Sequence, residues 1–270
     1  MGSCFAREIE RALVERGGNV VSIDRSIRSP EFHDDQGRVR TGFFHRFTPA
    51  SMALEFRWPF GLQQGWTEDA LIFAGANDTA IDMNYGAMCH DRSPAAVRTR
   101  RRVAGDLVRK VGNARIVIVT LGLTEGWVHR STGLPVNAID WRTLKNDHDA
   151  FQFVQMDVEA SLAALEAVLS TLASVHRDGD FQLFVTVSPV PFKITFTGED
   201  VVVANATSKS TLRAAAAQFA LRHERVHYFP SYELVTYSDP ALAWRPDRIH
   251  VEPAMVRHIM DRFIGAVFTA

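Results

Sequence analysis

Three residues near the two ends of the chain have side chains suited to act as a nucleophile, a base and an acid that orients the base. Cys4 begins a helix-like run that continues to Arg16, and backbone N–H groups and the positive end of a helix dipole favour a thiolate at such a position. Far along the chain, Asp247 and His250 have the spacing Asp-x-x-His. In a loop, this spacing lets the carboxylate hold one imidazole nitrogen while the other faces a nucleophile. The set would suit acyl transfer through a covalent intermediate, although the spacing alone is a weak signal in a chain with ten histidines.

Three apolar, β-branched runs predict the strands that would position these residues. They cover residues 114–121, 181–187 and 226–229, and helical sequence follows each of them. This alternation predicts the α/β class with a mostly parallel sheet. Ligands of such sheets bind outside the carboxyl ends of the strands. Polar, loop-like sequence stands at these ends, over residues 122–125, 188–189 and 230–233.

The remaining pattern predicts a single domain over residues 1–270, with loop insertions around residues 24–92 and 122–150. Apolar periodicity, capping residues and turn signals give these further expectations: helices over 4–16, 93–111, 154–176, 208–222 and 252–268, a helix entered through Thr48-Pro49, a short strand over 19–23, loop over 24–41, irregular structure over 122–149 and a hairpin over 194–204.

Composition narrows the class of function. The formal net charge is −1, which argues against a protein dedicated to binding nucleic acid or a membrane surface. No apolar run approaches the ~20 residues of a membrane span. Two cysteines do not suggest a disulfide framework or a cysteine zinc site, so we expect no metal, no cofactor and a reduced, cytoplasmic setting. The second cysteine lies in the run Cys89-His90-Asp91, whose adjacent side chains cannot normally converge as a triad must.

The motifs together resemble a known family. The opening Gly2-Ser3-Cys4-Phe5-Ala6 is the signature after which the GSCFA family is named, and this family is similar to a divergent branch of the SGNH (GDSL-like) hydrolases. The resemblance covers nearly the whole chain through these further motifs: Arg46-Phe47-Thr48, Thr120-Leu121-Gly122-Leu123-Thr124-Glu125-x-Trp127, Ser188-Pro189-Val190-Pro191, Asn205-x-x-Ser208-Lys209-x-x-Leu212-Arg213, Tyr228-Phe229-Pro230-Ser231-Tyr232-Glu233 and Asp247-x-x-His250. It implies a three-layer αβα fold with a mostly parallel sheet.

The SGNH pattern implies catalytic roles at particular positions of this sequence. Its Gly-Asp-Ser block matches Gly2-Ser3-Cys4, which makes Cys4 the nucleophile; a frame shifted by one would make Ser3 the nucleophile instead. The Asp-x-x-His block is intact, so Asp247 would orient the base His250.

The remaining blocks imply the residues that would contact substrate. The Gly-x-Asn-Asp block corresponds to Gly122-Leu123-Thr124-Glu125, so Thr124 replaces the asparagine that binds the oxyanion. The second-block glycine has no secure counterpart, and His45 is its nearest polar replacement. Glu125 would contact substrate as part of this block or, alternatively, would hold its own loop in place through hydrogen bonds. The triplet Asn205, Ser208 and Lys209 would contact substrate, or Asn205 or Thr207 would only cap the helix that follows.

The implied function is an esterase or acyltransferase that acts on a small-molecule or glycan ester. A protein that keeps the fold without catalysis, and binds glycans or serves as a scaffold, is the alternative. SGNH-like folds place the first block at the end of a central strand, and Met1 alone cannot form that strand. We therefore expect the first strand to be missing from the amino end, through truncation or a misassigned start.

Overall fold

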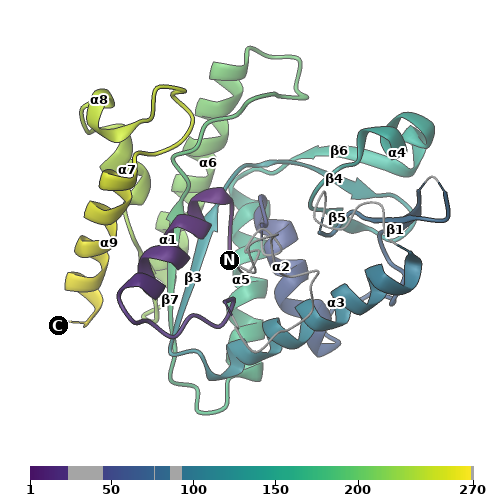
Figure 1. The fold of residues 1–270 in the computed structure, drawn as a ribbon, viewed down its shortest axis with the longest axis horizontal. Coiled ribbons are helices and arrows are strands. Elements are labelled where there is room, and N and C mark those ends of the chain that lie inside the picture. The colour runs from purple at the N-terminus through teal and green to yellow at the C-terminus, as the bar shows by residue number, and fades with distance from the viewer. Residues whose placement is uncertain (24–44, 76, 86–92, 269–270) are drawn as a thin grey trace.

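The structure is a computed structural model that describes residues 1–23, 45–75, 77–85 and 93–268. The expected loop over 24–41 and the run Cys89-His90-Asp91 lie outside these residues. Helices and strands alternate along the chain, as Figure 1 shows. The protein is therefore mixed α/β, as the sequence predicts.

The main sheet contains three parallel strands in the order β3-β7-β8. These are β3 (Ile116–Leu121), β7 (Gln182–Val187) and β8 (Val226–Tyr228), each within or equal to a predicted strand. Ile116 pairs with Gln182, and Leu183 pairs with Val226. Because all three strands run the same way, their carboxyl ends meet at one edge.

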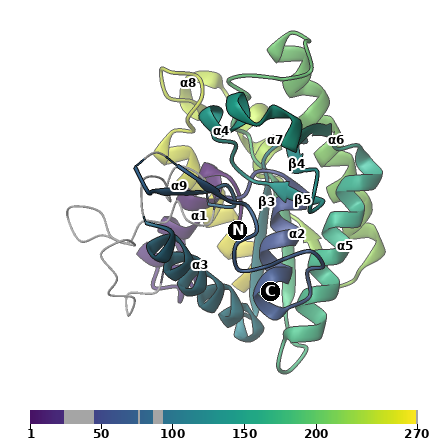
Figure 2. The ribbon, with the colours of Figure 1, turned by 90° about the vertical axis from the view of Figure 1, so that its right-hand side faces the viewer.

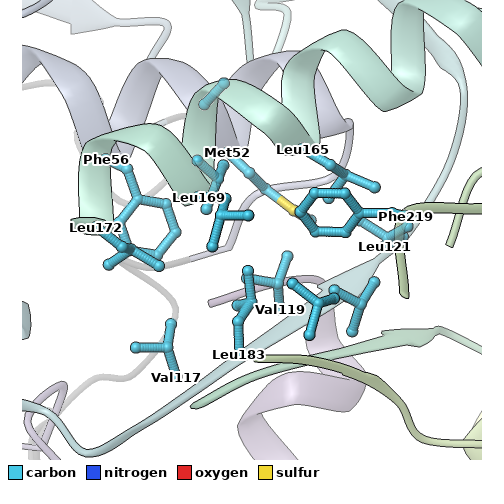
Figure 3. Packing of buried hydrophobic residues seen from close by; sticks show 14 of the residues in the cluster. Met52, Phe56, Val117, Val119, Leu121, Leu165, Leu169, Leu172, Leu183 and Phe219 are labelled. Atoms are coloured by element: carbon cyan, nitrogen blue, oxygen red, sulfur yellow. The ribbon is translucent and has the colours of Figure 1, made fainter. Parts of the chain in front are cut away.

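Alternate side chains of the main sheet enter two different apolar clusters. We call them cluster 1, which contains Val117, Val119 and Leu183, and cluster 2, against which Ile118 and Phe184 pack. Figure 3 shows Leu165, Leu169 and Phe219 facing the sheet within cluster 1. Helices thus cover both faces of the sheet (Figures 1 and 2).

Cluster 1 receives helices from the middle of the chain, and cluster 2 receives helices from its two ends. The helices that contribute to cluster 1 are α2 (Pro49–Arg57), α3 (Pro94–Arg109), α5 (Val158–Val175) and α6 (Val201–Arg222). Those that contribute to cluster 2 are α1 (Cys4–Glu15), α7 (Ser231–Thr236), α8 (Pro240–Ala243) and α9 (Pro253–Phe268). Short 3-10 turns occupy η3 (Trp58–Phe60), η5 (Lys110–Asn113) and η6 (His148–Ala150). The two chain ends therefore meet on one face of the sheet.

Local capping explains several helix starts. Thr48 accepts a hydrogen bond from the Ser51 N–H and begins α2 with Pro49 as its first residue. Ser93 caps α3 in the same way. These two starts are confirmed.

Residues 122–155 correct two sequence-based expectations, irregular structure over 122–149 and a helix that begins at residue 154 and not, as observed, at Val158. They form an antiparallel sheet in the order β5-β4-β6, from β4 (Glu125–His129), β5 (Leu134–Val136) and β6 (Phe151–Gln155), with the short helix α4 (Trp141–Asn146) between β5 and β6. The strands are short and mix polar residues with aromatic ones, and Glu125 pairs with Gln155 across 30 positions. Strands of this kind are stabilised by cross-strand pairs and not by an apolar run, so periodicity did not predict them.

Two other local predictions are wrong. The predicted strand over 19–23 is a turn, in which the Ile23 N–H donates to the Val20 carbonyl (2.9 Å). The predicted hairpin over 194–204 does not form, because Asp200 caps α6 by accepting from the Val202 N–H (2.8 Å). The cap prevails over the β-branched run that follows it. A last two-stranded ribbon, β1 (Ile72–Ala74) with β2 (Ala80–Asp82), lies within the predicted insertion of 24–92.

One helix, α5, is the only one within the described residues that is long and apolar enough to cross a membrane. This is weak support for a membrane span, because core helices of soluble proteins meet the same criterion. Leu165, Val168 and Leu172 of α5 are fully buried in cluster 1. Part of its apolar surface thus packs in the core, and 39% of the helix is buried.

Candidate active site

The opening residues of the chain lie beside the carboxyl end of β3. The Met1 amine donates to the Ile118 carbonyl (2.7 Å), and the Thr120 N–H donates to the Met1 carbonyl (2.9 Å). Gly2 then forms parallel bridges to Thr120 on one side and His45 on the other. Its φ of +152° and the 2.6 Å that would separate an added Cβ from the Thr120 Cβ both require glycine. This pairing delivers the next residues to the edge where the strands end.

Ser3, the alternative nucleophile, is committed to a buried hydrogen bond. Its side chain is 5% exposed, and its hydroxyl donates to the Ser188 hydroxyl directly after β7 (3.0 Å). Ser3 also stands at the N-cap of α1 without capping it through its side chain. Cys4 follows as the first residue of α1, and the structure describes it by its backbone only.

Asp247 and His250 form the hydrogen-bonded pair that their spacing predicts. The Asp247 Oδ2 and the His250 Nδ1 are 2.6 Å apart. The Asp247 Oδ1 accepts from the backbone N–H groups of Ile249 and His250, each at 2.9 Å. These hydrogen bonds hold the pKa of Asp247 well below its usual range, and the hydrogen bond from the imidazole has the largest effect. The carboxylate thus stays ionised and fixes the orientation of the ring.

Cluster 2 brings the two ends of the chain to the same part of the molecule. Phe5, the residue after Cys4, and Val251, the residue after His250, are both buried within it. Trp244 and Val251 form an antiparallel bridge that closes the loop carrying Asp247. The structure therefore places the first and the last predicted blocks against one apolar cluster, although their sequence positions lie far apart.

The loop after β3 uses its backbone N–H groups within the protein. Those of Gly122 and Leu123 both donate to the Phe47 carbonyl at 3.0 Å. The Thr124 N–H donates to the Ser208 hydroxyl at 3.0 Å. The Thr124 hydroxyl, by contrast, is buried and has no hydrogen-bond partner among the described residues. It is the one donor of this loop without a hydrogen-bond partner in the described structure.

Three predicted substrate contacts instead hold loops at this edge. Ser208 and Lys209 are 0% and 1% exposed on α6. The Lys209 ammonium donates to the Gly122 carbonyl at 2.6 Å, beside the Ser208 bond to Thr124. Asn205 accepts from the Phe192 N–H (3.1 Å) and so fixes the loop after β7; it lies within α6 and does not cap it. All three side chains therefore hold loops of the candidate site in place through hydrogen bonds to their backbone.

Glu125 has the anchoring role that was the alternative to substrate contact. Its carboxylate accepts from the Thr195 hydroxyl (2.6 Å) and from the Phe196 N–H (2.9 Å). The side chain is buried. Glu125 thereby joins the loop after β3 to the loop after β7.

His45 lies next to the opening residues with its ring largely buried. Its Nε2 has no partner among the described residues. Its pKa is lowered from 6.5 to about 4, chiefly by burial and in addition by the cationic side chains of Arg7 and Arg46. The ring is therefore neutral at physiological pH.

Sequence reasoning missed two contributors to this edge, the Ser188 hydroxyl and the Phe47 carbonyl. The sequence signals for Ser188 are its place directly after a buried strand and its place in the motif Ser188-Pro189-Val190-Pro191, but neither indicates a hydrogen bond to Ser3. Phe47 acts through its backbone, which no residue type reveals. Across the described ranges, no group of three or more His, Cys, Asp or Glu side chains gathers as metal ligands would.

Comparison with known proteins agrees with the motifs. No curated protein is similar enough in sequence to be identified as a relative. The model of the GSCFA family matches residues 1–263, which is essentially the entire chain. This protein therefore belongs to the GSCFA family.

Proposed function

We propose that the protein is an SGNH-like esterase or acyltransferase in which Cys4 is the nucleophile, His250 the base and Asp247 its orienting acid. The observation that carries the proposal is the Asp247–His250 hydrogen bond of 2.6 Å on a loop packed into cluster 2 together with Phe5. A parallel sheet with helices on both faces, and polar loops at its carboxyl edge, supports the three-layer SGNH arrangement.

The chemistry proceeds by two acyl transfers. The His250 Nε2 accepts the proton of the Cys4 thiol, and the sulfur attacks the ester carbonyl carbon. The tetrahedral intermediate collapses, the carbon–oxygen bond to the leaving alcohol breaks, and the imidazolium returns the proton to that oxygen. Water or an acceptor hydroxyl, deprotonated by His250, then attacks the thioester and releases the acyl group. Hydrolysis and transfer differ only in this last nucleophile.

The oxyanion is stabilised by few donors. The backbone N–H groups of Gly122, Leu123 and Thr124 already donate hydrogen bonds within the protein. The remaining donor of this loop is the Thr124 hydroxyl. The backbone N–H of Cys4, at the start of α1, is the second donor. Ser208 and Lys209 position Thr124 and do not touch substrate in this arrangement.

The proposal is tested by turnover of a short-chain aryl ester and by trapping the acyl-enzyme as a mass increase on Cys4. Cys4→Ala should abolish labelling and turnover, and His250→Ala should lower kcat by ~10²–10⁴. His258→Ala is the matched control, because His258 is an exposed histidine on α9. Wild-type turnover in both Cys4→Ala and His250→Ala would show that the triad is wrongly assigned.

A second candidate function, glycan binding without catalysis, is favoured by an aromatic group close to Glu125. Trp127, Trp141 and Phe153 each lie 5.4–5.9 Å, centroid to centroid, from the Phe196 ring. Trp141 is 53% exposed. This reading predicts that an oligosaccharide binds His250→Ala as tightly as the wild type, while Trp141→Ala weakens it, with no turnover in any variant.

A further inference from the structure

A short stretch directly before α2 contacts the opening block of the chain. We call residues 45–48 the connecting segment. Its first residue, His45, forms a parallel bridge with Gly2, and the next N–H, that of Arg46, donates to the Gly2 carbonyl at 3.0 Å. The connecting segment therefore fixes the backbone that leads into the proposed nucleophile.

The same segment also holds the loop after β3. The Phe47 carbonyl accepts from the N–H groups of both Gly122 and Leu123. Gly122 has no room for a side chain, because an added Cβ would lie 2.8 Å from the Phe47 carbonyl oxygen and 3.4 Å from the Ser3 Cβ. The opening block, the connecting segment and the loop after β3 are thus packed against one another at this point.

Asn137, the residue directly after β5, is bonded to the connecting segment at two places. Its Oδ1 accepts from the Phe47 N–H at 3.1 Å, and its Nδ2 donates to the His45 carbonyl at 2.8 Å. The Nδ2 also donates to the Asn84 carbonyl at 3.3 Å. One side chain from the antiparallel sheet thereby bonds both the residue that pairs with Gly2 and the residue that holds the loop after β3.

The chemistry of these three hydrogen bonds requires an amide at position 137. An amide offers an acceptor oxygen and two N–H donors, and in this orientation the oxygen and both donors are used. A carboxylate only accepts, so it would place a charged oxygen against the carbonyls of His45 and Asn84. Asparagine is therefore specified by its groups as well as by its shape.

A buried polar network holds the partners of Asn137 in place. The Asn84 Nδ2 donates to the Glu55 Oε2 at 3.0 Å, and the Arg46 guanidinium pairs with the same oxygen at 2.6 Å. Arg46 also donates to the His45 carbonyl, which thus has two donors. The Phe47 N–H, by contrast, donates to Asn137 alone among the described residues. A change at Asn137 should therefore act first on Phe47 and on the loop that it holds.

We propose that Asn137 is a positioning residue of the candidate site. It fixes the connecting segment, and with it the spacing between the block that carries Cys4 and the loop that carries Thr124. The inference deepens the proposed function and rests on it where catalysis is concerned. A displacement of ~1 Å between a nucleophile and an oxyanion donor can lower a rate by ~10²-fold.

The test compares Asn137→Asp with Asn146→Asp in the full chain. Asn137→Asp keeps the shape of the side chain and loses both donors. Asn146→Asp makes the same chemical change at an exposed position at the end of α4 and is the matched control. Asn137→Ala removes all three hydrogen bonds without adding a charge, so it replaces Asn137→Asp if that variant does not fold.

Two quantities are measured on each protein. We expect Asn137→Asp to lower kcat for a short-chain aryl ester by about tenfold or more, with KM within about twofold of the wild type. Hydrogen exchange of the Gly122 and Leu123 amides should become faster by about tenfold or more relative to the Val185 amide in β7. Asn137→Ala should act in the same direction on both quantities, and Asn146→Asp should match the wild type.

The two measurements separate this proposal from the proposed function. A wild type without esterase activity counts against the function, and hydrogen exchange then still tests the positioning role. Exchange that is unchanged at Gly122 and Leu123 in both Asn137 variants, or that accelerates equally at Val185, would overturn the proposal, because the second result indicates a general loss of stability. An unchanged kcat despite faster exchange at Gly122 and Leu123 would overturn it as well.

Discussion

The two halves of the candidate site are held in place by opposite means. On one side, Asp247 and His250 are three positions apart in one loop, and their side chains are 44% and 48% exposed. On the other side, Ser3 bonds Ser188 across 185 positions, and Thr124 bonds Ser208 across 84, all within the interior. The proposed base, His250, is thus positioned by local geometry, whereas the region of the proposed nucleophile and oxyanion donors is positioned by tertiary contacts.

This difference implies that the two halves of the candidate site contribute differently to the stability of the fold and to its chemistry. A buried polar group left without a partner destabilises the fold, because no water replaces the lost hydrogen bond. An exposed group loses little, since water takes the place of its partner. Changes on the buried side should therefore reduce stability, while changes at the Asp247–His250 pair should act on chemistry.

The largest effect on stability is expected from the titration of His45. Its folded-state pKa of about 4 is below the ordinary 6.5, so between these values the unfolded chain binds the proton and the folded one does not. Stability should therefore fall by about 3 kcal/mol as the pH drops from 6.5 to 4. Urea unfolding at several pH values measures this loss. His45→Gln should show a smaller loss, because the contribution of His45 is removed while that of the buried Met1 amine, whose pKa is lowered from 8.0 to about 5, remains.

His148→Gln is the control for that experiment, since His148 is an exposed histidine with a 75% exposed side chain. It should keep the acid-dependent loss of the wild type. Identical pH profiles for wild type and His45→Gln would mean that His45 is not protected from protonation by the fold.

A smaller effect is expected from Ser208→Ala. The change leaves the Thr124 N–H buried without its acceptor, and the expected cost is ~1–3 kcal/mol of unfolding free energy. Ser210→Ala removes an exposed hydroxyl two positions along the same helix and should change stability by less than ~0.5 kcal/mol. Equal stabilities for the two variants would remove the distinction between the buried and the exposed halves.

The smallest effect on stability is expected from Asp247→Asn. The low folded-state pKa of Asp247 stabilises the protein above the ordinary carboxyl pKa of ~3.9, and this contribution is lost as the pH falls further. Wild type and variant should thus differ slightly at pH 7 and converge below pH ~3.9. Under the proposed function, kcat should fall by ~10²-fold or more at pH 7, because the imidazole loses its orienting group.

A loss of stability in Asp247→Asn greater than that in Ser208→Ala would reverse the comparison. It would show that the exposed pair holds the fold together. Comparison of unfolding curves and turnover on the same preparations of each variant distinguishes the two cases.

Much of the scaffold was predictable because its signals are local. The apolar runs gave the three parallel strands, and Thr48 and Ser93 marked the starts of their helices. The sheet formed by β4, β5 and β6 was not predictable in this way, since its short polar strands depend on pairing with one another. The β-branched start of α6 favours a hairpin by its residue types, whereas the cap at Asp200 begins a helix there.

The same distinction between local signals and tertiary contacts applies to the candidate site. Sequence by itself determined the Asp247–His250 pair, because only two residues separate them in a tight loop and their side chains are therefore within hydrogen-bond reach. It also determined the class of the fold and the edge at which polar loops gather. The tertiary structure alone decided that Ser3 turns to Ser188 and that Ser208 and Lys209 support the Gly122–Thr124 loop. These contacts depend on strand register and helix packing, which set the distances between residues that the chain itself leaves far apart.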